Sequence, residues 1–289
     1  MFDPRVPLTP CPQAPIMLID VMRSLSHAVP RRVREPLRKA YHWNVGTRML
    51  AGPDGSDAVA TASAAWRTFG HAYGYLRSLR ERACVDATGA PVPWFTYPAI
   101  EFLNTLDMSA CRVFEYGAGN STRYWAARAA RVDAVESSPE WHARIAPTLP
   151  AHCSVALETT IPGYIDAVRR DPAGYDVIVV DGQNEDRGRE RCAAAAVEVL
   201  RPGGMVVLDD AAALPRSCTV LREAGLIEVP MSGFSPLNAY PNTTAFYLRR
   251  DFAIPRRHPE RCAWPVGAPH NVWEGDTLIV DAPPPPLPR

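Results

Sequence analysis

The sequence has almost no lysine: Lys39 is the single one, and arginine carries the rest of the positive charge. It also has no excess of either charge, since 31 basic residues balance 31 acidic residues. A neutral chain has no overall positive field to attract nucleic acid or an anionic membrane. We therefore expect neither as a partner and look for function in local sites.

Long apolar runs are absent as well, since no stretch approaches the roughly 18 uninterrupted apolar residues that a membrane-spanning helix needs. The first residues, MFDPRVPLTPCPQAPIML, have an early acid and repeated prolines where a signal peptide has a charged start and an apolar core. The 7 cysteines form no C-x-x-C pair, and an odd number cannot all pair within one chain. These absences predict a soluble, cytoplasmic protein with free thiols.

What the sequence does contain falls into three zones. Residues 1–90 begin with a proline-rich arm and then have apolar residues at helical spacing, which predicts an N-terminal helical layer. Residues 91–250 alternate short β-branched runs with longer helical patterns. Residues 251–289 are proline-rich and irregular apart from a strand expected at DTLIV, and their end favours polyproline II.

The middle zone predicts a sheet. Strands are expected at residues 112–116, 132–136, 154–158, 176–181, 205–210, 226–231 and 244–250. Helical stretches separate the first six, and strict alternation is typical of parallel strands in a doubly wound α/β fold. The last two strands are joined by SGFSPLNAYPNT, which has turn formers and no helical pattern, so we expect them to be antiparallel neighbours.

The stretch VFEYGAGNSTRYWA holds a glycine-rich turn directly after the first strand. Gly117 and Gly119 leave the backbone open to a ligand at the carboxyl edge of the sheet, and Asn120 or Ser121 can cap the next helix. A dinucleotide fingerprint needs G-x-G-x-x-G, but Thr122 occupies the third glycine position. A carboxylate just before the turn would also repel a pyrophosphate.

S-adenosylmethionine has no phosphates and carries a sulfonium and an ammonium, so the acidic Glu115 beside the turn favours it. Glu136 ends the second strand, where a carboxylate can accept hydrogen bonds from both ribose hydroxyls. Two acids at successive strand ends therefore predict this cofactor.

Residues from about Pro93 to Arg250 resemble the class I S-adenosylmethionine-dependent methyltransferases, through the motifs FEYGAGNS, VDAVESS, YDVIVVDG and LRPGGMVVLDD. PWFTYPAIEFL followed by VFEYGAGNST is similar to a bacterial group whose members mostly lack an assigned substrate. The resemblance implies a doubly wound, seven-stranded, mostly parallel sheet with an antiparallel last strand. It also implies cofactor contacts from Glu115, Gly117, Gly119 and Glu136. We expect these neighbours to complete the cofactor site: Ala118, Asn120, Ser121, Ser137 and, at the end of the fourth strand, Asp181.

Methyl transfer from a sulfonium is an in-line displacement, in which the protein aligns the acceptor and, where necessary, removes its proton. Asp181 and Asp210 are the candidate catalytic residues, because both end strands at the same edge of the sheet. Together with Asp209 they could also hold Mg²⁺, as in metal-dependent O-methyltransferases of this fold, or they could simply cap helices.

Two segments are candidates for the acceptor side of the site. Trp94, Phe95 and Tyr97 precede the first strand and can line the pocket, with core packing expected of two of the three. The loop SGFSPLNAYPNT rises at the same edge of the sheet.

The sequence thus predicts an S-adenosylmethionine-dependent methyltransferase that acts on a small-molecule acceptor, with oxygen as the expected methylated atom. One alternative is an NAD-dependent oxidoreductase, against which the missing third glycine argues. Another is a noncatalytic protein of the same fold that binds a partner through its helical arm and proline-rich tail. The acceptor, the general base and the oligomeric state are not predicted.

Overall fold

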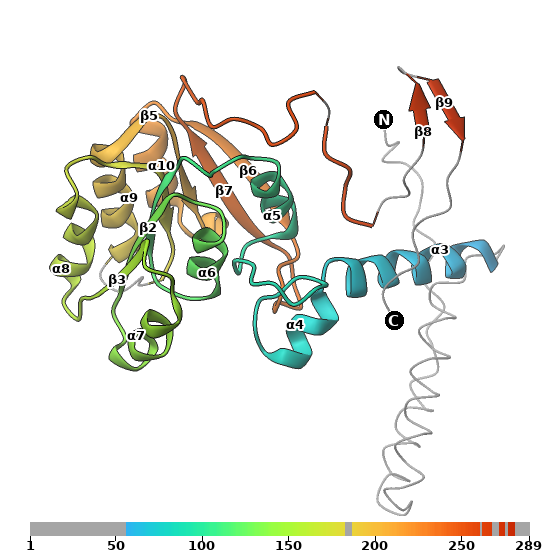
Figure 1. The fold of residues 1–289 in the computed structure, drawn as a ribbon, viewed down its shortest axis with the longest axis horizontal. Coiled ribbons are helices and arrows are strands. Elements are labelled where there is room, and N and C mark those ends of the chain that lie inside the picture. The colour runs from blue at the N-terminus through green and yellow to red at the C-terminus, as the bar shows by residue number, and fades with distance from the viewer. Residues whose placement is uncertain (1–55, 183–186, 261, 268–271, 275–276, 281–289) are drawn as a thin grey trace, which may run out of the picture. The chain divides into compact units, whose positions relative to one another are not determined.

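The computed structural model describes residues 56–182, 187–260, 262–267, 272–274 and 277–280 (Figure 1). The chain divides into two compact units, Met1–Ala65 and Trp66–Arg289. Helix α3 (Ser56–Arg67) begins in the first unit. The predicted proline-rich arm and the helical pattern before residue 56 lie outside the described residues.

A seven-stranded sheet forms the centre of the second unit, with the order β3-β2-β1-β4-β5-β7-β6 (Figure 1). Its strands are β1 (Arg112–Tyr116), β2 (Arg131–Glu136), β3 (Cys153–Leu157), β4 (Tyr175–Val180), β5 (Leu200–Leu208), β6 (Ile227–Gly233) and β7 (Asn242–Leu248). Strands β1 to β5 pair in parallel, whereas β7 is antiparallel to both of its neighbours. The predicted doubly wound α/β sheet with an antiparallel last strand is confirmed.

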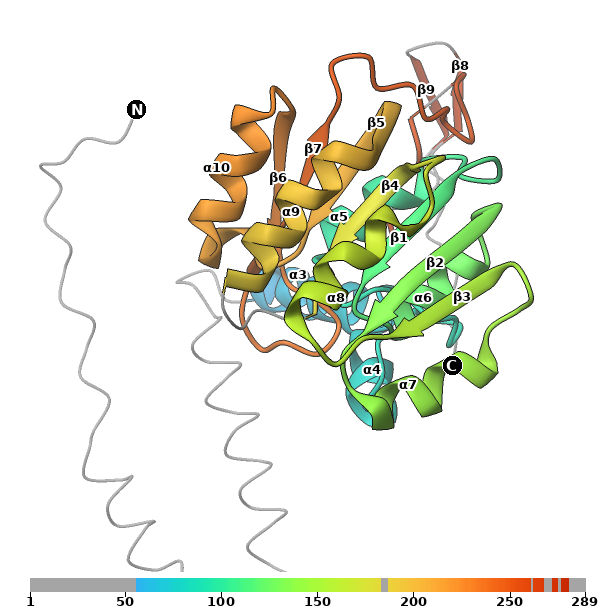
Figure 2. The ribbon, with the colours of Figure 1, turned by 90° about the vertical axis from the view of Figure 1, so that its left-hand side faces the viewer.

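Helices cover both faces of this sheet (Figure 2). One face carries α8 (Ile161–Asp166), α9 (Gly188–Val199) and α10 (Pro215–Glu223). The other face carries α5 (Tyr97–Asn104), α6 (Asn120–Ala126) and α7 (Pro139–Ile145), and α4 (Tyr75–Glu81) lies beyond the carboxyl ends of the strands (Figure 1). Short helical turns complete the unit: η1 (Thr68–Ala72), η2 (Ala146–Thr148), η3 (Ala167–Arg170) and η5 (Ala211–Ala213). In the part of the chain that is described, no helix has the length and apolar character needed to cross a membrane.

The strand sequences are nearly continuous apolar runs because both faces of the sheet are covered. Successive side chains of β1 point to opposite faces: Val113 packs towards α5 and α6, and Phe114 towards α8 and α9. The small side chains of α9 let it lie close to the sheet, and Ala193, Ala195 and Ala196 are fully buried. Both hydrophobic cores are therefore built on the same strands.

After β7 the chain passes along α5. The backbone amide of Asp107 donates to the carbonyl of Pro255 at 2.8 Å, and that of Arg257 donates to the carbonyl of Thr105 at 2.8 Å. Further on, β8 (Val272–Glu274) and β9 (Thr277–Val280) form a separate antiparallel pair. The strand expected at DTLIV is present as β9, whereas its partner β8 was not predicted.

Candidate active site

A cavity of about 570 Å³ opens at the carboxyl edge of the parallel strands. The turn after β1, the end of β2 and the turn after β4 all contribute to its wall. Seven of the expected cofactor residues line it together: Gly117, Ala118, Gly119, Asn120, Ser121, Glu136 and Asp181. Glu115 and Ser137 are the two expected residues that do not.

Three backbone amides of the glycine turn already donate hydrogen bonds to other groups of the protein. The amide of Gly117 donates to the carbonyl of Val135 at 2.8 Å. The amide of Ala118 donates to the Glu136 carboxylate at 3.0 Å, and that of Gly119 donates to the Thr122 hydroxyl at 2.9 Å. A turn that binds a pyrophosphate must instead direct free N–H groups at the ligand. These three amides are therefore not available to an anion.

The two glycines of the turn have different reasons for lacking a side chain. Gly117 has φ +88°, and a Cβ added there would lie 3.1 Å from the Cα of Gly182, in the turn after β4. Gly119 has extended backbone (φ −176°), and an added Cβ would meet no chain atom closer than 3.9 Å. Gly117 thus serves the close packing of two turns, whereas the missing side chain of Gly119 keeps the cavity open.

Glu136 is fixed by three backbone amides. One carboxylate oxygen accepts from Ala118 at 3.0 Å, and the other accepts from Ser137 and Ser138, both at 2.8 Å. Ser137 does not line the cavity, and its backbone amide holds the Glu136 carboxylate. A carboxylate has about four lone-pair positions, so at least one remains for a hydroxyl in the cavity.

Glu115 lies beneath the turn and not in the cavity wall. Only 1% of it is exposed, and its carboxylate accepts hydrogen bonds from the Thr122 hydroxyl and, at 3.2 Å, from Trp125 Nε1. The period of two along a strand explains this position, since Glu115 shares the face of Val113, which α6 covers. Burial raises the pKa of this carboxyl to about 8. A direct contact between Glu115 and a ligand in the cavity does not fit this geometry.

A buried arginine joins the ends of β4 and β5. Arg189, in the first turn of α9, donates from Nη2 to Asp181 Oδ1 at 2.8 Å. Its Nη1 lies 3.3 Å from Asp210 Oδ2 and 3.1 Å from the carbonyl oxygen of Asp209. Asn242 donates to the second oxygen of Asp210. Asp181 lines the cavity, but Asp210 is held on Arg189 and Asn242 and does not.

Asp209 is the more buried member of the pair that ends β5. Its Oδ1 accepts from the Thr244 hydroxyl at 2.6 Å. Burial, and then the nearby charge of Asp181, raise the pKa of Asp209 well above its usual range. Burial also raises the pKa of Asp181, although Arg189 opposes that shift.

The three carboxylates do not form a metal site. Among the described residues, no group of three histidine, cysteine, aspartate or glutamate side chains is placed to hold a metal ion. The guanidinium of Arg189 already bonds Asp181 and Asp210, so a cation of the protein itself lies between two of the three candidate ligands. This donor set does not fit Mg²⁺, which requires near-octahedral oxygen ligands.

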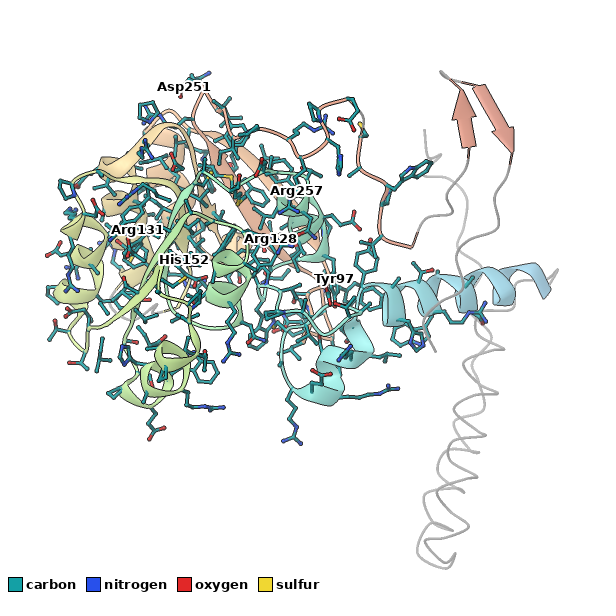
Figure 3. All side chains as sticks on the ribbon, in the orientation of Figure 1. Tyr97, Arg128, Arg131, His152, Asp251 and Arg257 are labelled. Carbon is teal, nitrogen blue, oxygen red and sulfur yellow. The ribbon has the colours of Figure 1, made fainter. Side chains whose placement is uncertain are left out.

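The wall opposite the turn comes from segments outside the first five strands. Cys84, Trp94 and Leu237 contribute to it. Phe95 and Tyr97 are buried in the core, and the Tyr97 ring packs edge-on against Phe69 with the centroids 5.7 Å apart (Figure 3). The prediction that two of the three aromatic residues pack in the core is confirmed.

Sequence reasoning missed several residues of the site, among them Trp141 and Arg189. Trp141 of α7 lines the cavity, and its indole N–H donates to the carbonyl of Ala118. An aromatic residue one turn into the helix after the acidic strand end was the available signal. Arg189 sits in the first turn of a helix, where the helix dipole disfavours a cation, and that position was a signal of a specific partner.

One family model matches part of the chain. Residues 114–211, from within β1 to the start of η5, match the model described as a methyltransferase domain. No curated protein matched the chain.

Solved structures of remote similarity include three methylating enzymes. A precorrin-6y C5,15-methyltransferase from Geobacter metallireducens is 15% identical, with a TM-score of 0.43 over 53% of this chain and 87% of that one. The N-methyltransferase NodS from Bradyrhizobium japonicum, in complex with S-adenosyl-L-homocysteine, is 19% identical, with a TM-score of 0.41 over 62% of this chain and 99% of that one. An rRNA methylase from Streptococcus thermophilus is 14% identical, with a TM-score of 0.38 over 53% and 96%.

Proposed function

We propose that this chain is a class I S-adenosylmethionine-dependent methyltransferase and that it transfers a methyl group to an oxygen atom of a small-molecule acceptor; the methyltransferase-domain match supports the first part. The observation that carries the proposal is the internal bonding of the turn amides of Gly117, Ala118 and Gly119. With those donors used, these three amides offer a pyrophosphate no hydrogen bond. A cofactor without phosphates does not need them, whereas the dinucleotide of an oxidoreductase would have to do without them.

The residues present fit this cofactor. Glu136, fixed by three amides at the end of β2, would hold the ribose hydroxyls. Gly119 leaves the space in which the bound molecule can approach the backbone. Asp181, which also lines the cavity, would supply negative charge near a cationic ligand. When bound, S-adenosylmethionine supplies an electrophilic methyl group, and the chain's own residues hold and orient the reactants.

Oxygen as the methylated atom is supported by the carboxyls beside the cavity. A hydroxyl acceptor must lose a proton, and a base works best when its pKa lies near the working pH. Burial raises the pKa of both Asp181 and Asp209 above the usual carboxyl range. We assign proton removal to Asp181, which lines the cavity, and we assign Asp210 the role of holding Arg189.

The proposal is tested by calorimetric titration of the full-length protein with S-adenosylhomocysteine and, separately, with NAD. We expect saturable binding of the first and none of the second. Preferential binding of NAD would support the oxidoreductase alternative, and binding of neither would support a noncatalytic role. Formation of an ether or ester product from labelled S-adenosylmethionine and a panel of hydroxyl and carboxyl compounds then tests the methylated atom.

A further inference from the structure

Two segments beside the cavity contain no charge. Residues 87–100 and 229–248 have no aspartate, glutamate, lysine, arginine or histidine, in a chain of which 21% is charged. One precedes and begins α5, and the other runs from β6 through the loop into β7.

These segments lie side by side, although they are far apart in sequence. The amide of Tyr97 donates to the carbonyl of Phe234 at 2.8 Å, and the indole N–H of Trp94 donates to Asn238 Oδ1 at 3.2 Å. A Cβ added to Gly233 would come within 2.9 Å of the ring of Pro98. Such close contacts make the two segments one continuous surface.

This surface exposes large aromatic side chains. Trp94 is 50% exposed, Phe234 41% and Tyr240 64%. The hydrogen bond to Asn238 fixes the orientation of the Trp94 ring, and the ring of Phe234 is supported from behind by Phe69, with the centroids 5.3 Å apart. Exposed aromatic rings held in fixed orientations are typical of a binding surface.

The surface continues into the cavity, where Trp94 and Leu237 form part of the wall. The turn side of the same cavity carries Glu136 and Asp181, together with arginines of α6 and α7. The cavity thus has a charged part, which suits a cofactor with a sulfonium, an ammonium and a carboxylate. Its other part contains Trp94 and Leu237 from the two uncharged segments, together with Glu81 and Arg82 at the end of α4.

We propose that the uncharged aromatic surface formed by Trp94, Phe234, Leu237 and Tyr240 binds the methyl acceptor, and that the acceptor is an uncharged molecule with a planar aromatic body carrying the reacting hydroxyl. This inference rests on the proposed function, since it identifies the substrate class of that site. A polyanionic acceptor would need arginine or lysine on this surface, and the two segments supply neither. The exposed rings offer an acceptor flat apolar faces for stacking.

The test uses the full-length protein saturated with S-adenosylhomocysteine and measures binding of 2-naphthol by calorimetry. Glucose and 2-naphthyl phosphate serve as polar and charged comparison ligands. We expect 2-naphthol to bind and to bind about ten-fold more tightly than either of them, because stacking needs no charge. Tighter binding of glucose or the phosphate would overturn the inference.

Trp94→Ala should weaken 2-naphthol binding by about ten-fold and leave S-adenosylhomocysteine binding within about two-fold of wild type. Trp264→Ala is the matched control, since that tryptophan is 41% exposed but lies outside the cavity wall. Phe234→Ala tests the same surface if the first variant does not fold. Equal effects of Trp94→Ala and Trp264→Ala on 2-naphthol would refute the inference, as would loss of S-adenosylhomocysteine binding in Trp94→Ala.

Failure of the wild type to bind S-adenosylhomocysteine would refute the proposed function. Failure to bind 2-naphthol while S-adenosylhomocysteine binds normally would refute only the acceptor class.

Discussion

Gly119 lacks a side chain although nothing in the chain requires it to. Its backbone is extended and an added Cβ would meet only ordinary contacts at 3.9 Å. Because Gly119 lines the cavity, we infer that its lack of a side chain leaves room for a bound ligand.

Gly119→Ala should fold with unchanged stability, or with stability raised by up to about 1 kcal/mol, because alanine restricts the unfolded chain. It should weaken S-adenosylhomocysteine by at least about ten-fold, since the methyl group enters the cavity. Thermal melting and calorimetry measure the two effects. Gly117→Ala is the contrasting variant: with φ +88° and a 3.1 Å contact to Gly182, it should lose stability. Normal cofactor affinity in Gly119→Ala would contradict this explanation.

Glu136 is the strongest single candidate for cofactor binding, because its carboxylate is held in place before any ligand arrives. Glu136→Ala should weaken S-adenosylhomocysteine by about 1.5–3 kcal/mol, the range for hydrogen bonds to a charged group. Glu140→Ala, an exposed acid in the first turn of α7, is the control and should have no effect. Unchanged affinity in a folded Glu136→Ala variant would remove this residue from the cofactor site.

Glu115 makes stability depend on pH. Burial raises the pKa of its carboxyl from 4.5 to about 8, so between these values the folded state keeps a proton that the unfolded state has released. The free energy of unfolding should therefore fall as pH rises through that window, by on the order of 3 kcal/mol.

Urea denaturation at pH 5 and pH 8 measures this fall. Glu115→Gln keeps the shape and removes the titration, so its curve should be flatter than that of wild type. The raised pKa values of Asp181 and Asp209 also make stability fall as pH rises, and they do so in both proteins. The difference in slope between wild type and variant is therefore the contribution of Glu115. Identical slopes would show that Glu115 is ionised in the folded protein.

One side chain joins the start of α9 to the strand ends by hydrogen bonds. Arg189 donates to Asp181 and Asp210 and to the backbone of Gly182 and Asp209, and it joins the ends of β4 and β5 to the start of the helix. This bonding also sets the position of Asp181 in the cavity wall.

Arg189→Met should destabilise the protein by on the order of 3 kcal/mol, because it leaves partly buried carboxylates without their cation. It should also change the pH dependence of any methyl transfer, since the pKa of Asp181 would rise further once Arg189 no longer lowers it. Arg169→Ala breaks an exposed pair with Glu198 and should lose less than about 1 kcal/mol. Chemical denaturation measures the loss of stability in both variants, and equal losses would contradict a structural role for Arg189.

The segment after β7 is part of the folded domain as far as residue 267. Ile254 is buried in the same core as α5, and the amide of Val266 donates to Glu101 at 3.2 Å. The same carboxylate oxygen of Glu101 accepts from the Tyr73 hydroxyl at 2.6 Å. One residue of α5 therefore binds both the C-terminal segment and the aromatic segment that precedes α4.

A chain that ends at Arg250 should melt about 5 °C or more below the full-length protein, because it exposes the core around Ile254 and leaves Glu101 with one partner. A chain that ends at Gly267 keeps these contacts and should melt near the full-length value. Equal melting temperatures of the full-length protein and the chain that ends at Arg250 would show that the segment adds nothing to stability.

The amino-acid sequence by itself determined the order of strands and helices, the antiparallel hairpin at the end and the position of the glycine turn. These features depend on local patterns: apolar periodicity, turn formers and the absence of a crossover helix between the last two strands. The turn residues Gly117 and Gly119 and the acid Glu136 were found for the same reason, since each directly follows or ends a strand.

Only the tertiary structure decided which chemical groups face the cavity. Glu115 and Glu136 look equivalent in sequence, yet the alternation along β1 buries one under α6 and the hydrogen bonds of the turn hold the other at the edge. Arg189 and Trp141 belong to two different helices, and only packing brings them to this edge of the sheet. These contacts join residues that are far apart in the chain, and no local sequence pattern encodes them.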